Sequence, residues 1–177
     1  MLSNNIIYEN NLLSSNDNDR PTKYRIRRML DSDVNTLVKI EEITWPFEPW
    51  TADTFFHCLG EPFTYCWILV SVTNDHSVLG YAIQYFIREK SEIANLCIHP
   101  DQRGGGLGGI LLHHMINYAH QFGYRIHQLE VNTSNIHAYR LYNKFGFKIV
   151  GVRKQFYSDG ADAYDMQLIV DEVHPKM

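Results

Sequence analysis

The stretch from Asn95 to Gly109, NLCIHPDQRGGGLGG, decides the fold of this chain of 177 residues. It joins an apolar run, which predicts a β-strand, to a glycine cluster that opens a segment with helical spacing of apolar residues. Free N–H groups at the start of a helix attract anions, and glycines without a Cβ let a phosphate come close to the backbone. The stretch therefore predicts a cradle for a pyrophosphate group. A flexible, glycine-rich surface loop is the alternative.

Two other phosphate-binding motifs are weighed against this reading. Gly104, Gly106 and Gly109 match the dinucleotide pattern G-x-G-x-x-G, with Glu130 further along as the acidic residue of such sites. A dinucleotide loop turns directly out of its strand into glycine, whereas here residues 99–103 intervene. A Walker phosphate loop needs a Lys followed by Ser or Thr, and neither closes this glycine run. The context thus favours a different class of phosphate ligand.

The composition is that of one ordinary domain, because 45% of the residues are hydrophobic and can form a core. A net charge of -4 gives no general field for polyanions, so nucleic acid is not expected as a direct partner, whereas a basic peptide is compatible. The three cysteines are odd in number and lack C-x-x-C spacing, and the nine histidines follow no metal-ligand spacing. These patterns predict neither a disulfide framework nor a metal site, and they imply a reducing cytoplasm.

The chain divides into three parts. Residues 1–22 are rich in Asn, Ser and Asp, lack the features of a signal peptide and contain no apolar run of membrane length, so they predict a flexible extension. Residues 23–172 predict one domain, and residues 173–177 a short tail. Early hairpins and a later alternation of strands and helices predict a mixed α/β sheet with four helices, the first of them capped by Asp31 or Ser32.

Several segments of the chain resemble those of a known family. The segment HPDQRGGGLGG resembles the R-x-x-G-x-G acetyl-CoA loop of the GNAT superfamily of N-acetyltransferases, with Arg103, Gly106 and Gly108 at the signature positions. The segment LEVNTSNIHAYRLYNKFGF, residues 129–147, resembles the second half of the RimI group, the bacterial ribosomal-protein-alanine N-acetyltransferases. FEPWTADTF and RKQFYSDGADAYDM resemble that group's acceptor-side elements, so the likeness runs from Tyr24 to about Val170.

This resemblance implies the GNAT fold, a mixed and mostly antiparallel sheet of about seven strands with four helices. It also implies that the strands EIANLCI and RIHQLEV splay apart and that acetyl-CoA, with no metal, wedges between them. Backbone N–H groups of the first strand would contact the acetyl carbonyl and the pantetheine arm, and Asn135 would bind the pantetheine. A fully paired buried strand and a helix cap are the respective alternatives. The cofactor residues implied are Leu96, Cys97, Ile98, Arg103, Gly104, Gly105, Gly106, Leu107, Gly108, Gly109 and Asn135.

Glu130 and Tyr142 are the candidates for proton transfer. Glu130 stands between Leu129 and Val131 in an otherwise apolar strand and points to the opposite face from them. The resemblance makes Glu130 the general base. Tyr142 follows twelve residues later, which matches the RimI pair, and the resemblance makes it the general acid for the leaving thiolate. The alternatives are a solvent-facing carboxylate and a packed aromatic ring.

For the acceptor, the resemblance implies the N-terminal alanine of a small-subunit ribosomal protein, bound as a basic N-terminal peptide by a monomer or weak dimer. Asn132 departs from the RimI pattern, which usually carries Arg after LEV. A GNAT enzyme for lysine or for a small-molecule amine, or a non-catalytic acetyl-CoA-binding module, would show the same glycine loop. Five aromatic residues in the acceptor-side segments either line the cleft or pack in the core: Trp45, Phe47, Trp50, Phe156 and Tyr157.

Overall fold

The computed structural model describes residues 6–8, 24–72 and 77–170. Of the predicted extension, residues 1–22, it describes only Ile6–Tyr8, which form strand β1; the rest of the extension and the tail 173–177 lie outside the described residues. The chain separates into two compact units, of which the first comprises Met1–Ile83 and Asn95–Leu111 and the second Gln84–Ala94 and Leu112–Met177.

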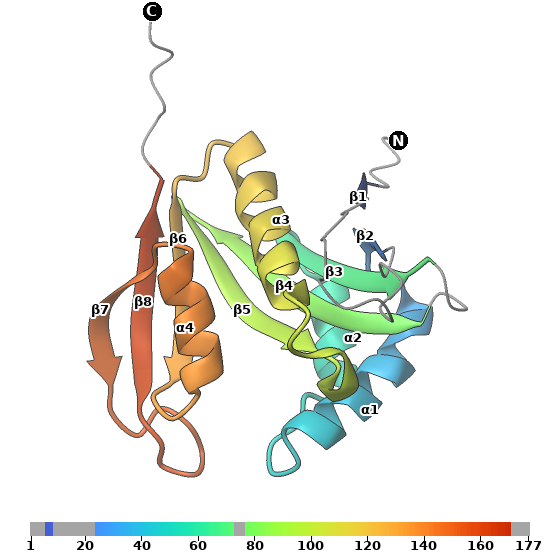
Figure 1. The fold of residues 1–177 in the computed structure, drawn as a ribbon, viewed down its shortest axis with the longest axis horizontal. Coiled ribbons are helices and arrows are strands. Elements are labelled where there is room, and N and C mark those ends of the chain that lie inside the picture. The colour runs from blue at the N-terminus through green and yellow to red at the C-terminus, as the bar shows by residue number, and fades with distance from the viewer. Residues whose placement is uncertain (1–5, 9–23, 73–76, 171–177) are drawn as a thin grey trace, which may run out of the picture. The chain divides into compact units, whose positions relative to one another are not determined.

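In the first unit the strands follow the order β1, β2 (Tyr24–Arg28), β3 (Thr64–Ser71), β4 (Val78–Ile87) and β5 (Lys90–Ile98), the last two being shared with the second unit. Figure 1 shows the elements by these labels. The helices of this unit are α1 (Val34–Thr44) and α2 (Ala52–Gly60), and two short 3-10 turns, η1 (Asp31–Asp33) and η2 (Pro100–Gln102), precede α1 and follow β5. The core between them contains Trp67, Ile68 and Leu69 of β3 and Leu37 of α1, all fully buried.

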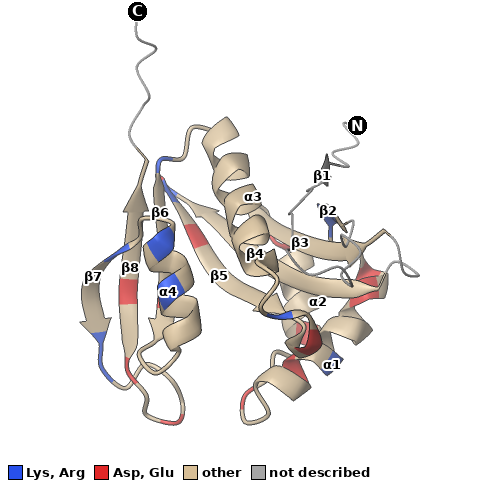
Figure 2. Cartoon of the chain, in the orientation of Figure 1, with Lys and Arg blue, Asp and Glu red and all other residues tan. Residues whose placement is uncertain are grey.

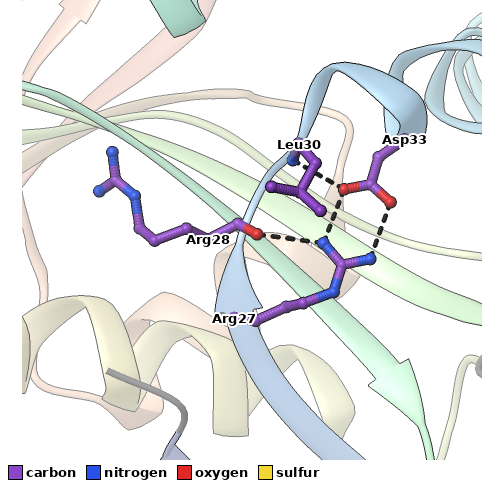
Figure 3. Close-up of polar contacts among 4 residues, drawn as sticks. All are labelled: Arg27, Arg28, Leu30 and Asp33. Atoms are coloured by element: carbon purple, nitrogen blue, oxygen red, sulfur yellow. Dashed lines mark hydrogen bonds and ion pairs between the residues drawn. The ribbon is translucent and has the colours of Figure 1, made fainter. Parts of the chain in front are cut away.

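An ion pair fixes the turn from β2 into α1. Arg27 donates to both carboxylate oxygens of Asp33, at 2.7 and 2.8 Å, and the Leu30 N–H donates to Asp33 Oδ2 at 2.8 Å. Figure 3 shows Asp33 held from these two sides, with Arg27 also donating to the Arg28 carbonyl. Burial would raise the pKa of Asp33, but the hydrogen bonds outweigh it and leave that pKa below its ordinary value. The predicted cap at Asp31 or Ser32 is wrong, because η1 contains both residues and α1 begins at Val34 with Asp33 in the N-cap position, where the Asp33 side chain makes no cap hydrogen bond to α1.

The second unit holds most of α3 (Leu107–Gln121), followed by β6 (Ile126–Asn132), α4 (Ile136–Lys144), β7 (Lys148–Arg153) and β8 (Ala163–Ile169). Its strand order is β4-β5-β6-β8-β7, and β6 is parallel to β5 but antiparallel to β8. The β5 pairing covers only Lys90↔Ile126 to Glu92↔Gln128, whereas β8 pairs with all of β6. Beyond Gln128, β6 is thus paired on one side only within the described residues.

Burial alternates along β6 as the sequence predicted. Leu129 and Val131 are buried with 1% and 4% of their surface exposed, and the side chain of Glu130 between them is 18% exposed. His127 shares the buried face, and its burial lowers its pKa to about 4. Helix α4 packs through Tyr139, whose ring lies 5.8 Å from that of Tyr164 on β8.

Candidate active site

The glycine cluster has the geometry expected of an anion cradle. Gly104 and Gly106 have positive φ angles of 86° and 78°, and a Cβ added at either would meet no protein atom within 4 Å. Helix α3 begins at Leu107, and its first backbone hydrogen bonds run from the Gly109 and Ile110 N–H groups to the Gly106 carbonyl. The N–H groups of Gly104–Gly108 donate to no backbone carbonyl of the described chain, so they can donate to an anionic ligand. These residues fit a pyrophosphate group.

Arg103 is tied into the first unit. Its Nε donates to the Ile98 carbonyl at 3.0 Å, and its Nη2 donates to Thr44 Oγ1 at 3.4 Å. The side chain therefore links the end of β5 and the end of α1 to the start of the glycine loop. This contact orients the loop, and any contact of Arg103 with a phosphate would use its remaining N–H groups.

The predicted acetyl-binding strand is held close to its neighbour. Cys97 is buried, and burial raises the pKa of its thiol to about 11, which leaves the side chain unreactive and the backbone as the part available to a ligand. Opposite it lies Gly80 of β4, where an added Cβ would stand 2.6 Å from the Cys97 carbonyl oxygen and 2.7 Å from Ile98 Cδ1. Gly80 thus permits the close approach of the two strands, a requirement that the sequence analysis did not identify.

A buried polar cluster centred on Glu41 is a second feature that was not predicted from the sequence. This carboxylate is 1% exposed, and it accepts hydrogen bonds from the Trp50 N–H at 2.8 Å, from Asn95 Nδ2 at 3.3 Å and from the Tyr81 hydroxyl. Burial raises the pKa of Glu41 to about 6, against the opposing effect of the Trp50 and Asn95 hydrogen bonds. The cluster connects α1 with the segment just before α2, with β4 through Tyr81 and with Asn95 of β5. The sequence held one indication of this cluster, because Glu41 occupies a position on the otherwise apolar face of α1.

In the second unit, Glu130 does not stand free. Its Oε1 accepts a hydrogen bond from Arg153 Nη1 at 2.7 Å, and that guanidinium also lies 4.5 Å above the ring of Phe156. Phe156 in turn meets Tyr157 edge to face. Burial and the nearby Glu130 carboxylate both raise the pKa of Tyr157. The aromatic pair between β7 and β8 therefore lies beside the predicted base, which favours the site over the core for Tyr157.

Tyr142 is buried on α4, 7% exposed, with its ring 5.8 Å from that of Phe147. Burial, and secondarily the neighbouring Tyr157, raise its pKa well above the ordinary value of a tyrosine. The phenol therefore stays protonated at every working pH and can act as a hydrogen-bond donor. Proton transfer from it to a thiolate is uphill, by at least about 2 kcal/mol from the ordinary pKa values of a phenol and a thiol.

Asn135 forms the N-cap of α4, where its Oδ1 accepts a hydrogen bond from the Ala138 N–H at 3.1 Å. This is the capping role considered as the alternative, and it leaves the amide Nδ2 for the predicted pantetheine contact. Phe47 is 98% exposed and Trp45 36% exposed, so neither is a core residue, while Trp50 packs on Phe55 with ring centroids 5.6 Å apart.

The predicted residues thus fall into two groups. Those for the cofactor, apart from Asn135, lie in the first unit, and Glu130, Tyr142 and Asn135 lie in the second. Within the described ranges no three His, Cys, Asp or Glu side chains gather in a way that could hold a metal ion. All three cysteines are buried and free. No helix of the described residues is both long and apolar enough to span a membrane.

Comparison with known proteins gives one consistent result. A model of the acetyltransferase (GNAT) family matches residues 31–147. A Bacillus subtilis protein, provisionally named a [ribosomal protein bS18]-alanine N-acetyltransferase, is 34% identical over 85% of this chain and 99% of its own length. The enzyme of that name from Escherichia coli K12 is 29% identical over 74% of this chain and 86% of its own.

Solved structures agree with these sequence matches. The crystal structure of the Escherichia coli ribosomal-protein-S18-alanine N-acetyltransferase gives a TM-score of 0.75 at 27% identity, over 87% of this chain and 98% of that one. Arabidopsis thaliana NAA60 in complex with acetyl-CoA gives a TM-score of 0.76 at 18% identity, over 84% of this chain and all of that one, and shares the fold. The predicted fold is confirmed, with an eight-stranded sheet that includes the short strand β1.

Proposed function

The chain belongs to the acetyltransferase (GNAT) family, and from this premise we propose that it transfers the acetyl group of acetyl-CoA to the N-terminal α-amine of a protein, namely the alanine that begins a small-subunit ribosomal protein. The observation that carries the proposal is the similarity to relatives named for this reaction, which extends over 85% of the chain in the Bacillus subtilis protein. Such an acceptor implies action in the cytoplasm. We further propose that the protein acts as a monomer or weak dimer.

The glycine loop supports the first half of the proposal. The N–H groups of Gly104–Gly108 would hold the pyrophosphate of acetyl-CoA, and the backbone of Leu96–Ile98 would hold its pantetheine arm and acetyl carbonyl. Acetyl-CoA supplies the acetyl group as a thioester. A structure of Arabidopsis thaliana NAA60, which shares the fold, was solved with acetyl-CoA.

Glu130 and Tyr142 would carry the proton transfers. Glu130 would take a proton from the acceptor ammonium, directly or through one water, and so generate the free amine that attacks. Tyr142, kept protonated by burial, would donate a hydrogen bond to the sulfur as negative charge develops there and would be the general acid for the leaving thiolate. Because the pKa of Tyr142 is raised, its hydrogen bond to the sulfur is expected to contribute more to stabilising the thiolate than complete transfer of the proton does.

Proton energetics favour an α-amine over a lysine. An α-amino group has a pKa of about 7.7 to 8.0, so roughly a tenth or more of it is free base at pH 7, whereas Lys, at about 10.4, costs about 3 to 4 kcal/mol more to deprotonate. A glutamate that is only partly buried is suited to the easier task. Acidic residues Glu48, Asp159 and Asp162 could attract the basic residues of the peptide, although Asp162 is already paired with Lys154 at 2.7 Å.

The test uses two peptides of one basic sequence. The first begins with a free alanine, and the second is blocked at its N-terminus but retains a lysine. We expect acetylation of the first alone, located by mass spectrometry. Comparable acetylation of both would reject the α-amine assignment in favour of a lysine or small-amine enzyme. Calorimetric binding of acetyl-CoA without any acetylated product from a cell lysate would identify a non-catalytic binding module.

A further inference from the structure

The predicted base lies in a group of three carboxylates within the second unit. Glu130 of β6 is paired directly with Asp165 of β8 in the antiparallel register, and Glu92 of β5 is paired with Gln128, two residues before Glu130. Residues paired across strands, and residues two apart in one strand, point to the same face of a sheet. All three carboxylates therefore share one face. Figure 2 shows acidic positions on β5 and β8 of this unit.

The electrostatic interaction among the three carboxylates changes the pKa of Glu92. Burial raises the pKa of Glu92, and the charges of Glu130 and Asp165 raise it further, while Arg153 and Lys90 oppose the shift. Like charges opposite one another in a sheet are unfavourable. This face thus needs a cation if all three carboxylates are to stay ionised at neutral pH.

Arg153 supplies that cation. Its Nη1 lies 2.7 Å from Glu130 Oε1, and among the described residues no other Lys or Arg forms an ion pair with Glu130, Glu92 or Asp165. Lys90 donates to Gln128 Oε1 at 2.9 Å, and Gln128 Nε2 donates to Asp165 Oδ1 at 2.9 Å. Lys90 therefore makes its hydrogen bond to the Gln128 amide, and it acts on Glu92 only through the field of its charge.

The guanidinium is held in place from its other side. Arg153 ends β7, where it is paired with Ala163, and its guanidinium stacks on Phe156, three residues later. The chain between them turns sharply at Gln155, whose φ is 49° and whose N–H donates to Asp162 Oδ1 at 3.0 Å. The Arg153 guanidinium is therefore held between the Phe156 ring and the Glu130 carboxylate.

We propose that Arg153 is a positioning residue for Glu130, fixing Oε1 so that Oε2 takes the proton of the acceptor amine, and supplying the positive charge on the face that Glu130 shares with Glu92 and Asp165. The inference rests on the proposed function, in which Glu130 is the base. In the described part of the chain Oε2 accepts no hydrogen bond, so it is the oxygen available to a proton. Because Arg153 is 54% exposed, the pair contributes little to stability, and its effect is expected in the protonation of the group.

The main variant is Arg153→Met, which keeps most of the stacking surface and removes the charge. We expect the acid limb of the pH profile of kcat/KM to move upward by about one pH unit, the shift that a carboxylate gains from an adjacent cation. At a pH below the limb, kcat/KM then falls about tenfold, with a much smaller loss on the plateau. Arg153→Lys should restore most of the original limb, since the charge returns without the planar fork.

Two further variants separate this role from a structural one. Lys154→Met removes the adjacent cation, which pairs with Asp162, and should leave the limb in place. The double variant Arg153→Met with Glu92→Gln removes one of the repelling carboxylates as well, and should return the limb toward that of the parent. Circular dichroism of each variant confirms that it is folded.

A readout without substrate makes the inference independent of the acceptor. Carboxyl 13C NMR of the full chain follows the titration of Glu92, assigned with Glu92→Gln, and Arg153→Met should raise its midpoint while Lys154→Met should not. A Glu92 midpoint and an acid limb that both stay unchanged in Arg153→Met would overturn the inference. If the Glu92 midpoint moves but neither peptide is acetylated by the parent, the charge arrangement stands and the proposed function fails.

Discussion

Stability should depend on pH through Glu41, and the dependence can be isolated with one substitution. The pKa of Glu41 is raised to about 6 by burial, from 4.5 for an unburied glutamate. A carboxyl whose pKa is higher in the folded state stabilises that state fully below its unfolded pKa, and the contribution is lost as pH rises through the folded value. The loss therefore occurs between about pH 4.5 and 6.

The magnitude follows from the shift. A difference of about 1.5 pKa units at 1.36 kcal/mol per unit gives at most about 2 kcal/mol of unfolding free energy lost on going from pH 4 to pH 7.5. Glu41→Gln cannot titrate, and its single amide oxygen can keep only one of the two bonds, that from the Tyr81 hydroxyl at Oε1 or that from the Trp50 N–H at Oε2. The loss of the other bond does not depend on pH, so it cancels when the variant is compared at two pH values. The variant should therefore be less stable than the parent at pH 4 by about 2 kcal/mol more than at pH 7.5.

Urea unfolding of parent and variant at six or more pH values measures this difference directly, because contributions from other groups cancel. The matched control is Glu42→Gln, the next residue of α1, whose side chain is exposed. Its difference from the parent should stay flat across the same range. A flat difference for Glu41→Gln, or a difference of opposite sign, would refute the reasoning and show that the carboxylate is ionised at little cost where it lies.

Three other predictions concern the site. Gly106→Val should abolish acetyl-CoA binding in calorimetry, because a β-branched residue is strained at a φ of 78° and its side chain enters the space of the pyrophosphate. Gly105→Ala is the control, because Gly105 has no positive φ, and its affinity for acetyl-CoA should stay much closer to that of the parent. Glu130→Gln and Tyr142→Phe should lower kcat by roughly tenfold or more with little change in acetyl-CoA affinity, since both act on proton transfer; an unchanged rate between pH 6 and 9 would argue against Glu130. Gly80→Ala should destabilise the fold by about 1 to 3 kcal/mol in urea, because its Cβ would stand 2.6 Å from a backbone oxygen that can move only with its strand.

Local patterns predicted most of the fold correctly. The alternation around Glu130 placed Leu129 and Val131 on the buried face, and helical spacing after the glycines placed the start of α3. Both depend on interactions within a few residues, which periodicity records. The start of α1 was predicted less well, because the choice among Asp31, Ser32 and Asp33 depends on Arg27 from the preceding strand.

Long-range contacts were beyond the reach of such patterns. Glu41 contacts Asn95, 54 positions later, and nothing near either residue indicates that a glutamate of α1 is buried beside a tyrosine and an asparagine. Gly80 gave no signal either, since its requirement comes from the backbone of β5, to which it is packed. The role of each of these residues depends on contacts with residues that are distant in sequence and adjacent only in the folded chain.

The same distinction bears on the assignment of the base. Sequence spacing predicts that Glu130 points away from the core, and the similarity to named acetyltransferases makes it the candidate for proton removal. Neither the spacing nor the similarity shows that the Glu130 carboxylate forms an ion pair with Arg153 or lies on one face with Glu92 and Asp165. The charges of Glu130, Asp165 and Arg153 all act on the pKa of Glu92 in this group. If Glu130 is the base, as we propose, substitution of Arg153 or Glu92 should change the pH range of catalysis while Glu130 itself stays the same, a change that a motif comparison of β6 alone would not detect.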